Sequence, residues 1–162
     1  MAVSGARPVS GFGITVGVPG RWDVRLYRRT PLPGEAAHAV LHAATFPLPA
    51  DRGDFGDGAV DRMGPADVFV ALVEFDPASV GTALFAAVGF PAPLRSDDLS
   101  RTSLQHQLGR QSGAQRFFHA GGRAWCLYTV IGDDAARGQL VGVANRLIAG
   151  IEVSASAGPG SP

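Results

Sequence analysis

The chain of 162 residues contains no lysine, and all 14 of its basic residues are arginines. Without lysine the protein cannot form a Schiff base, has no lysine for a phosphate-binding loop and has no ammonium group for general base catalysis. The arginines are scattered along the chain rather than clustered. This favours the codon bias of a GC-rich bacterial genome over selection for bidentate arginine contacts.

The chain also has only one cysteine and no net charge. The single cysteine, Cys126, excludes an internal disulfide and a cysteine-based zinc cluster. The 14 acidic residues balance the arginines, so the chain lacks the basic charge of a nucleic-acid-binding protein. No apolar run approaches the ~20 residues of a membrane-spanning helix, and we expect no integral membrane segment.

The length and the hydrophobic content of 46% indicate one globular domain. We place this domain at residues 11–153, after a flexible segment at 1–10 and before a disordered tail at 154–162, which is rich in small residues, glycine and proline. The first residues lack the apolar core of a secretory signal, so we expect a cytoplasmic protein.

Period-two patterns predict most of the strands. Residues 12–18 and 22–27 alternate around Pro19-Gly20, which predicts an antiparallel hairpin. Residues 36–46 fit a helix or a strand, and Val40, Thr45 and Phe46 favour the strand. The continuous apolar run 67–75 predicts a central strand that is covered on both faces.

The second half of the chain adds a hairpin and a helix. Gly121-Gly122 separates two apolar runs and predicts a tight hairpin in which His119 opposes Ala124. An apolar stripe predicts a helix from Asp133 or Asp134 to about residue 149, followed by a short strand at 151–153. The stripe consists of Leu140, Val141, Val143, Ala144, Leu147 and Ile148. Shorter helices are expected at about 58–63, with Asp57 as its cap, at 78–88 and at 102–108.

This order of elements predicts an α+β fold. A mostly antiparallel sheet would pack against a long C-terminal helix and shorter helices, as in an α/β sandwich.

Signatures of catalysis and cofactor binding are missing from the sequence. There is no Gly-x-Ser-x-Gly elbow, no dinucleotide fingerprint and no phosphate-binding loop. His38 and His42 lie four residues apart, but no third ligand accompanies them, so we interpret them as satisfied or surface histidines. The aspartates between Asp51 and Asp61 do not have the spacing of a calcium loop. We therefore predict no metal and no cofactor.

The remaining candidates lie on or near the predicted hairpin. Arg116, Phe118, Trp125 and Tyr128 combine arginine with aromatic rings, a mixture that suits a binding surface. The alternative, which we favour, is a core strand pair with one exposed edge.

Two ionisable residues complete the candidate set. Glu74 lies in the apolar strand, where burial raises the pKa of a carboxyl group and suits it to acid or base chemistry, or it points outward at the strand end. His119 is the second candidate for such a role.

The segment Gly11-Phe12-Gly13-Ile14-Thr15-Val16, continued by Pro19-Gly20-Arg21-Trp22, resembles the start of Mog1/PsbP-like domains. The later order of a strand ending in Ala124-Trp125-Cys126-Leu127-Tyr128, a helix and a short strand is similar as well. The resemblance implies an α/β/α sandwich and a non-catalytic binding or assembly role, often in membrane-associated settings in actinobacteria. It carries no functional residues over to this chain.

Taken together, the sequence predicts a small module that binds another protein and has no catalytic role. The alternative is a small-molecule-binding protein or an enzyme with a pocket between the sheet and the C-terminal helix. The partner, its identity and the oligomeric state are left open by the sequence.

Overall fold

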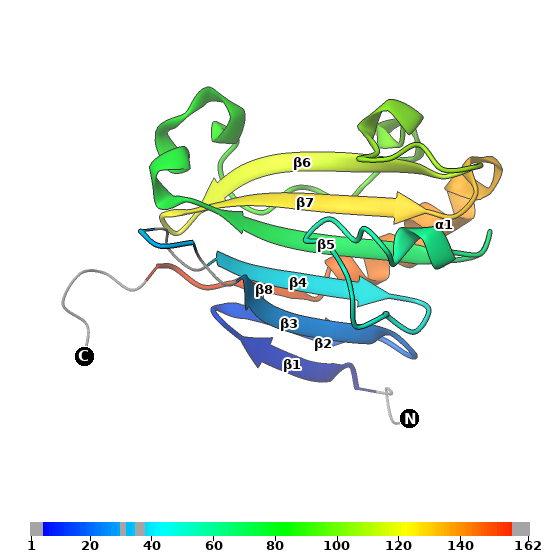
Figure 1. Cartoon of the computed structure of the whole chain (residues 1–162), viewed down its shortest axis with the longest axis horizontal. Coiled ribbons are helices and arrows are strands. Elements are labelled where there is room, and N and C mark those ends of the chain that lie inside the picture. Colours follow the sequence, from blue (N-terminus) through cyan, green and yellow to red (C-terminus); the bar gives the residue numbers. More distant parts are fainter. Residues whose placement is uncertain (1–4, 30–31, 35–37, 157–162) are drawn as a thin grey trace.

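Two antiparallel sheets make up most of the computed structural model, which describes residues 5–29, 32–34 and 38–156 (Figure 1). The larger sheet has the strand order β3-β4-β5-β7-β6. Its strands are β3 (Asp23–Arg29), β4 (His38–Ala44), β5 (Val68–Phe75), β6 (Ser112–Ala120) and β7 (Arg123–Ile131). The smaller sheet has the order β1-β2-β8, with β1 (Arg7–Gly11), β2 (Ile14–Val18) and β8 (Ile151–Val153).

The predicted central strand is confirmed. β5 lies between β4 and β7, and its residues 68–73 are all buried. Side chains at even positions, such as Leu72, face the smaller sheet and the helix, whereas those at odd positions, such as Phe69, face the opposite side. Both faces of this strand are therefore covered, which explains why the sequence shows a continuous apolar run rather than alternation.

The second predicted hairpin is also confirmed. Gly121 and Gly122 have φ angles of 59° and 78°, and they connect β6 to β7 with His119 opposite Ala124. The ambiguous segment 36–46 contains strand β4, as expected, although residues 36 and 37 lie outside the described residues.

The first predicted hairpin is wrong. β2 pairs with β1 and β8, whereas β3 pairs with β4, so the chain passes from one sheet to the other at Pro19-Gly20. The turn of the actual hairpin is Phe12-Gly13, with φ angles of 54° and 79°. Its first strand, β1, occupies residues 7–11 and so begins within the segment 1–10 that the sequence placed before the domain. Alternation identifies the side chains that share a face, but it does not identify the partner strand.

The helical content is lower than expected. In the described part of the chain the only α-helix is α1 (Arg137–Ile148), which follows a 3₁₀ turn at Asp134–Ala136. The side chain of Asp133 caps that turn by accepting a hydrogen bond from the backbone N–H of Ala135 at 2.9 Å. A helix of 12 residues is shorter than the predicted one.

Each of the three shorter helices is replaced by 3₁₀ turns. These turns are Val60–Arg62, Pro77–Gly81, Ala83–Phe85 and Arg101–Ser103, and a further one lies at Ser96–Asp98. Asp57 does not cap the first of them, because Ala59 is the residue that precedes it. Gly58, Gly81 and Gly109 lie in or directly beside the three segments, and glycine disfavours a longer helix.

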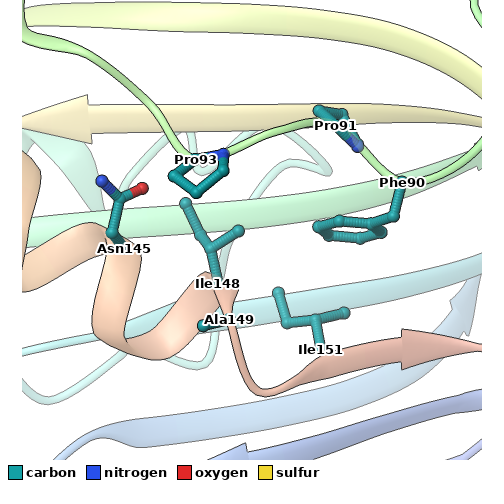
Figure 2. Close-up of a pocket in the computed structure, with 7 residues that line it drawn as sticks. All are labelled: Phe90, Pro91, Pro93, Asn145, Ile148, Ala149 and Ile151. Atoms are coloured by element: carbon teal, nitrogen blue, oxygen red, sulfur yellow. The ribbon is translucent and has the colours of Figure 1, made fainter.

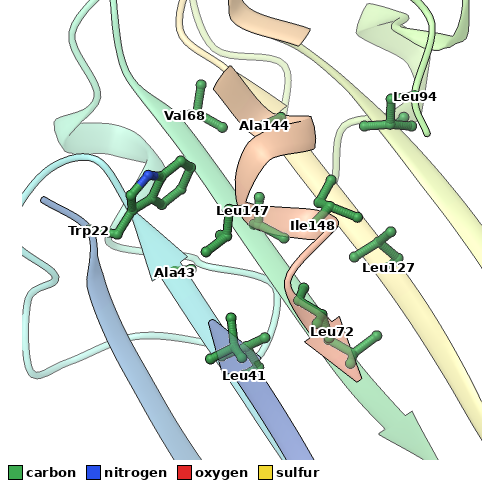
Figure 3. Close-up of a cluster of buried hydrophobic side chains, with 14 of the residues drawn as sticks. Trp22, Leu41, Ala43, Val68, Leu72, Leu94, Leu127, Ala144, Leu147 and Ile148 are labelled. Atoms are coloured by element: carbon green, nitrogen blue, oxygen red, sulfur yellow. The ribbon is translucent and has the colours of Figure 1, made fainter. Parts of the chain in front are cut away.

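The apolar stripe of α1 packs on the larger sheet as expected (Figure 3). Ala144, Leu147 and Ile148 lie in one cluster with Leu41 and Leu72. Residues of the smaller sheet, among them Ile14, Val16 and Ile151, belong to the same cluster. One face of the larger sheet is thus covered jointly by α1 and the smaller sheet, and loops with 3₁₀ turns cover the other face.

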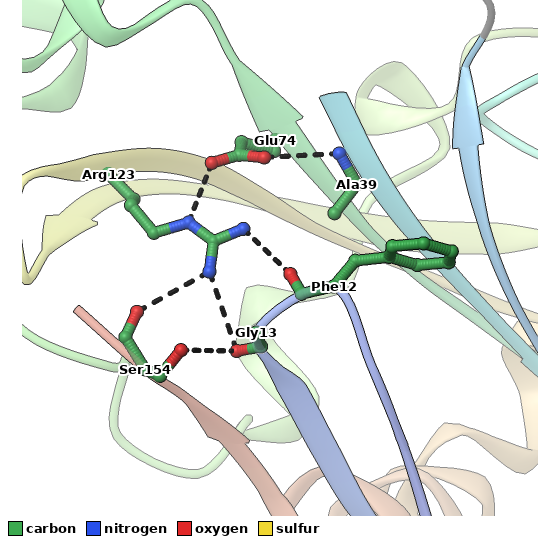
Figure 4. Close-up of polar contacts among 6 residues, drawn as sticks. All are labelled: Phe12, Gly13, Ala39, Glu74, Arg123 and Ser154. Carbon is green, nitrogen blue, oxygen red and sulfur yellow. Dashed lines mark hydrogen bonds and ion pairs between the residues drawn. The ribbon is translucent and has the colours of Figure 1, made fainter. Parts of the chain in front are cut away.

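A largely buried ion pair on the larger sheet places a guanidinium group against the turn of the smaller sheet (Figure 4). The Nε of Arg123 on β7 donates to Glu74 Oε2 on β5 at 2.6 Å, and Glu74 Oε1 accepts from the backbone N–H of Ala39 on β4 at 3.1 Å. The other guanidinium nitrogens reach the smaller sheet. Nη2 donates to the carbonyl oxygen of Phe12 at 3.0 Å, and Nη1 lies 3.5 Å from that of Gly13 and 3.4 Å from that of Ser154.

The same corner holds the start of the predicted disordered tail. The backbone N–H of Ser154 donates to the carbonyl of Gly13, and that of Ser156 donates to the carbonyl of Gly121, both at 2.8 Å. Residues 154–156 are therefore bound to two hairpin turns, and residues 157–162 lie outside the described residues.

We predict that Gly13→Ala destabilises the protein more than Gly20→Ala. Both glycines have positive φ, so each alanine costs about 1–2 kcal/mol in backbone energy. A Cβ at residue 13 would also lie 2.1 Å from Arg123 Nη1, whereas a Cβ at residue 20 meets nothing within 4 Å. We expect Gly13→Ala to lower the free energy of unfolding by about 1–3 kcal/mol more than the control. If urea denaturation showed the same loss in free energy of unfolding for both variants, the contact between Arg123 and the turn at residue 13 would not contribute to stability.

Candidate functional site

The aromatic residues of the β6–β7 hairpin do not form one surface. Phe118 and Trp125 are fully buried and face α1 and the smaller sheet. Tyr128 is buried on the opposite face, where its hydroxyl oxygen accepts from the backbone N–H of Gln105 at 2.9 Å. Arg116 lies on the edge strand and donates to Asp98 Oδ2 at 2.5 Å. The arrangement is a core strand pair with an edge, and only the edge is available to a partner.

The two ionisable candidates, Glu74 and His119, lie on opposite faces of the larger sheet. Glu74 is engaged in its ion pair with Arg123, so it is not a free acid or base. His119 lies on the other face of the sheet, and its Nδ1 is 2.5 Å from the carbonyl oxygen of Phe85. Burial raises the pKa of the Cys126 thiol to about 12, so no thiolate nucleophile forms there near neutral pH.

His42 connects the loop after β4 to the sheet. Arg52 Nε donates to His42 Nδ1 at 2.9 Å, which leaves the ring proton on Nε2, and Nε2 donates to the carbonyl oxygen of Asp54 at 2.8 Å. The hydroxyl of Tyr27 donates to Asp54 Oδ1 at 2.8 Å and secures the same loop. Burial, together with the smaller effect of the Arg52 charge, lowers the pKa of His42 to about 4, although the hydrogen bond to the Asp54 carbonyl acts to raise it.

His38 is buried on the same face of β4, as the spacing of four residues requires in a strand. Within the described residues, however, no three histidine, cysteine, aspartate or glutamate side chains gather in a group that would hold a metal ion. His42 is therefore a satisfied core histidine.

The outer edge of β6 is the most distinctive surface of the larger sheet. Backbone groups of successive residues in an edge strand point alternately toward the neighbouring strand and away from it. The backbone groups of Gly113 and His119 bond to segments outside the sheet, so it is the even-numbered residues of β6 whose backbone groups bond to β7. The pairing of β6 with β7 has no break, so the backbone groups of the odd-numbered residues Gln115 and Phe117 also point away from β7. The N–H and C=O groups of these two residues point outward, and none of them pairs with another backbone group in the ranges that the structure describes.

Two segments cap the edge on either side of this open section (Figure 1). The backbone of His119 bonds to Ala87 and Gly89 at 2.9 and 2.8 Å. The backbone of Gly113 exchanges two hydrogen bonds with Ser100 at 2.8 and 3.0 Å. Both ends of β6 are thus occupied, and only the middle of the edge stays open.

A hollow of about 320 Å³ lies at the open section. Its walls come from 87–92 and from residues 116–118 of β6. Val88, on this wall, is 81% exposed, which is high for a valine. Phe90 and Pro91 supply further apolar surface, so the hollow combines free backbone groups with an apolar wall.

A second hollow, of about 200 Å³, lies beside the C-terminal end of α1 (Figure 2). It is lined by Phe90, Pro91, Pro93, Asn145, Ile148, Ala149 and Ile151. The Asn145 side chain is fully engaged with the backbone of Leu94, donating to its C=O and accepting from its N–H at 2.9 Å each. The lining contains no ionisable side chain, so this hollow offers no acid–base chemistry.

Comparison with protein-family models, with curated proteins and with solved structures finds no match to this chain. The resemblance to Mog1/PsbP-like domains therefore stays a prediction from the sequence. In the described residues, α1 lies on one face of the larger sheet, and 3₁₀ turns and loops cover the other face. None of the helices described is long and apolar enough to cross a membrane.

We predict that acid weakens the fold through His42. Its pKa is about 4 in the folded protein and about 6.5 in the unfolded chain, so the unfolded chain binds more protons between these values. The free energy of unfolding should fall by up to about 3 kcal/mol as the pH drops through this window. Denaturation measured from pH 7 to pH 4 should lose most of this dependence in His42→Gln but keep it in His106→Gln, which alters an exposed histidine. An unchanged slope in His42→Gln would contradict the assignment.

We also predict an alternating pattern of amide exchange along β6. The amides of Gln115 and Phe117 should exchange rapidly, because their N–H groups face outward without a backbone partner. Arg116 and Phe118, which bond to β7, should be protected, as should the capped residue His119. Residue-resolved hydrogen exchange by NMR measures this directly. Uniform protection from 113 to 119 would show that the edge is closed.

Proposed function

We propose that this chain is a non-catalytic protein-interaction module that binds an extended segment of a partner protein at the open edge of β6. The observation that carries the proposal is the outward-facing backbone of Gln115 and Phe117, open between two capped ends. Strand addition of this kind gains affinity from main-chain hydrogen bonds and specificity from neighbouring side-chain pockets.

The size of the opening favours a short segment. The open section covers residues 115–117, which is about 10 Å of strand. The caps at Ala87–Gly89 and Ser100 occupy the position that a neighbouring strand would take at either end. A second copy of the nine-residue strand β6 would collide with them, so the arrangement favours a partner peptide over edge-to-edge pairing of two copies.

The hollow beside the edge supplies the side-chain contact. A segment lying along residues 115–117 directs alternate side chains to the two faces of the sheet. Those on the side of Arg116 and Phe118 would meet the apolar wall of Val88, Phe90 and Pro91. We therefore expect the partner segment to carry an apolar side chain between polar neighbours.

A matched pair of variants tests the proposal. Gln115→Pro removes the outward N–H and places a ring where a partner carbonyl would bind, whereas Gln115→Ala keeps the N–H. Both variants lose the side-chain hydrogen bond from Gln115 Nε2 to the carbonyl oxygen of Ser103, so that loss cancels in the comparison. Peptides selected from a displayed library of random linear sequences would be titrated against the wild type and both variants.

We expect Gln115→Pro to weaken binding of the selected peptides by about tenfold relative to Gln115→Ala, which is the effect of a lost hydrogen bond together with a steric clash. The amides of Gln115 and Phe117 should become protected in the complex. Equal binding by the two variants, or a library that yields no binding peptide, would overturn the proposal. Equal thermal stability of the two variants would verify that the difference in affinity does not come from partial unfolding of Gln115→Pro.

A further inference from the structure

A second surface surrounds Trp22, in the connection between the two sheets and next to β3, which forms the sheet edge opposite to β6. Trp22 is only 9% exposed, and it lines two hollows. The smaller, of about 240 Å³, is lined by Pro19, Gly20, Arg21, Trp22, Val143 and Arg146. The larger, of about 600 Å³, is lined by Arg7, Arg21, Trp22, Asp23, Thr45, Phe46 and Pro47.

Three arginines of these hollows have no partner for their side chains. Arg7, Arg21 and Arg146 are exposed, and none forms an ion pair, a hydrogen bond or a ring contact with another residue of the described ranges. By contrast, several arginines elsewhere are paired with carboxylates, such as Arg116 with Asp98 and Arg123 with Glu74. Arg28, Arg62, Arg95 and Arg101 also lack an ion pair, but none of them lines these hollows, so the three arginines form one group of unpaired charge beside Trp22.

The acidic groups nearby are already engaged. Asp23 accepts from Arg25 Nε at 2.9 Å and from the backbone N–H of Leu48 at 2.8 Å. Asp67 accepts from Thr45 Oγ1 at 2.9 Å and from the backbone N–H of Gly64 at 2.8 Å. With Arg25 included, the surface has four arginines and two carboxylates, so it carries an excess of positive charge.

We propose that this surface binds an acidic, extended segment of a partner protein. The two hollows share Arg21 and Trp22 as a common wall, so an occupant of both must cross that wall as a chain. Carboxylates on the segment would pair with Arg7, Arg21 and Arg146. An apolar side chain between them would contact Trp22 and Phe46. Such charge complementarity raises the association rate and selects the partner, and arginine is enriched at interfaces of this kind.

Fluorescence titration tests the proposal, because Trp22 is one of only two tryptophans and the other, Trp125, is fully buried. The probe is a peptide of about ten residues in which glutamate alternates with leucine or serine, long enough to cross both hollows. Its matched control carries glutamine in place of glutamate. Inorganic phosphate and a short single-stranded DNA serve as anions of other classes.

We expect the glutamate peptide to change the Trp22 signal and the glutamine peptide to have no effect. Binding should weaken severalfold from about 0.05 to about 0.5 M salt. Arg21→Gln and Arg146→Gln should each weaken it by about threefold, and the double variant by about tenfold. Arg62→Gln removes an exposed arginine outside this surface and should have no effect. Gln115→Pro should also bind the peptide normally, which separates this surface from the β6 edge.

Three results would overturn the proposal. One is a glutamate peptide that binds no better than its glutamine control. Another is equal affinity in the Arg21→Gln, Arg146→Gln and Arg62→Gln variants. The third is tighter binding of phosphate or DNA than of the peptide, because the surface would then recognise anions of another class.

Discussion

The guanidinium group of Arg123 makes the polar contact between the two sheets, beside the apolar cluster that they share. It pairs with Glu74 on the larger sheet, lies 4.5 Å from the ring of Trp125 and bonds to the carbonyl of Phe12 on the smaller sheet. Burying a charge is costly unless its hydrogen bonds are satisfied, and here one carboxylate and several carbonyls satisfy them. The requirement explains two features of the turn. Gly13 leaves room for the guanidinium, and Phe12 adopts a φ of 54°, which a bulky residue adopts only when its surroundings fix it.

The layers that result leave the larger sheet without an open face. The smaller sheet and α1 fill one side with apolar side chains, and loops with 3₁₀ turns fill the other. The loops are themselves fixed by polar contacts such as those of His42, Arg52 and Asp54. The two surfaces that we propose for partners accordingly lie at the edges of the sheet, at β6 on one side and beside Trp22 near β3 on the other.

The sequence predicts the elements that local patterns determine. The apolar run of β5, the glycine pair at Gly121-Gly122 and the stripe of α1 all have one interpretation in terms of period or turn geometry. Pairing between distant strands has no such signal. The alternation around Pro19-Gly20 therefore predicts β2 beside β3, whereas β2 pairs with β1 and β8. The candidate site shows the same division. Burial of Trp125 and Tyr128 on two opposite covered faces, and the pairing of Glu74 with a residue 49 positions away, depend on tertiary contacts that no local pattern contains.

A double-mutant cycle on Arg123 and Glu74 tests the central claim most directly. The free energy of unfolding would be measured for the wild type, Arg123→Met, Glu74→Gln and the double variant. If Glu74 holds the guanidinium in its place at the turn of the smaller sheet, each single variant leaves a largely buried group without its partner and costs about 3 kcal/mol. The double variant then costs much less than the sum, with a coupling energy of about 2 kcal/mol or more. Additive losses, with a coupling energy below about 0.5 kcal/mol, would contradict the account.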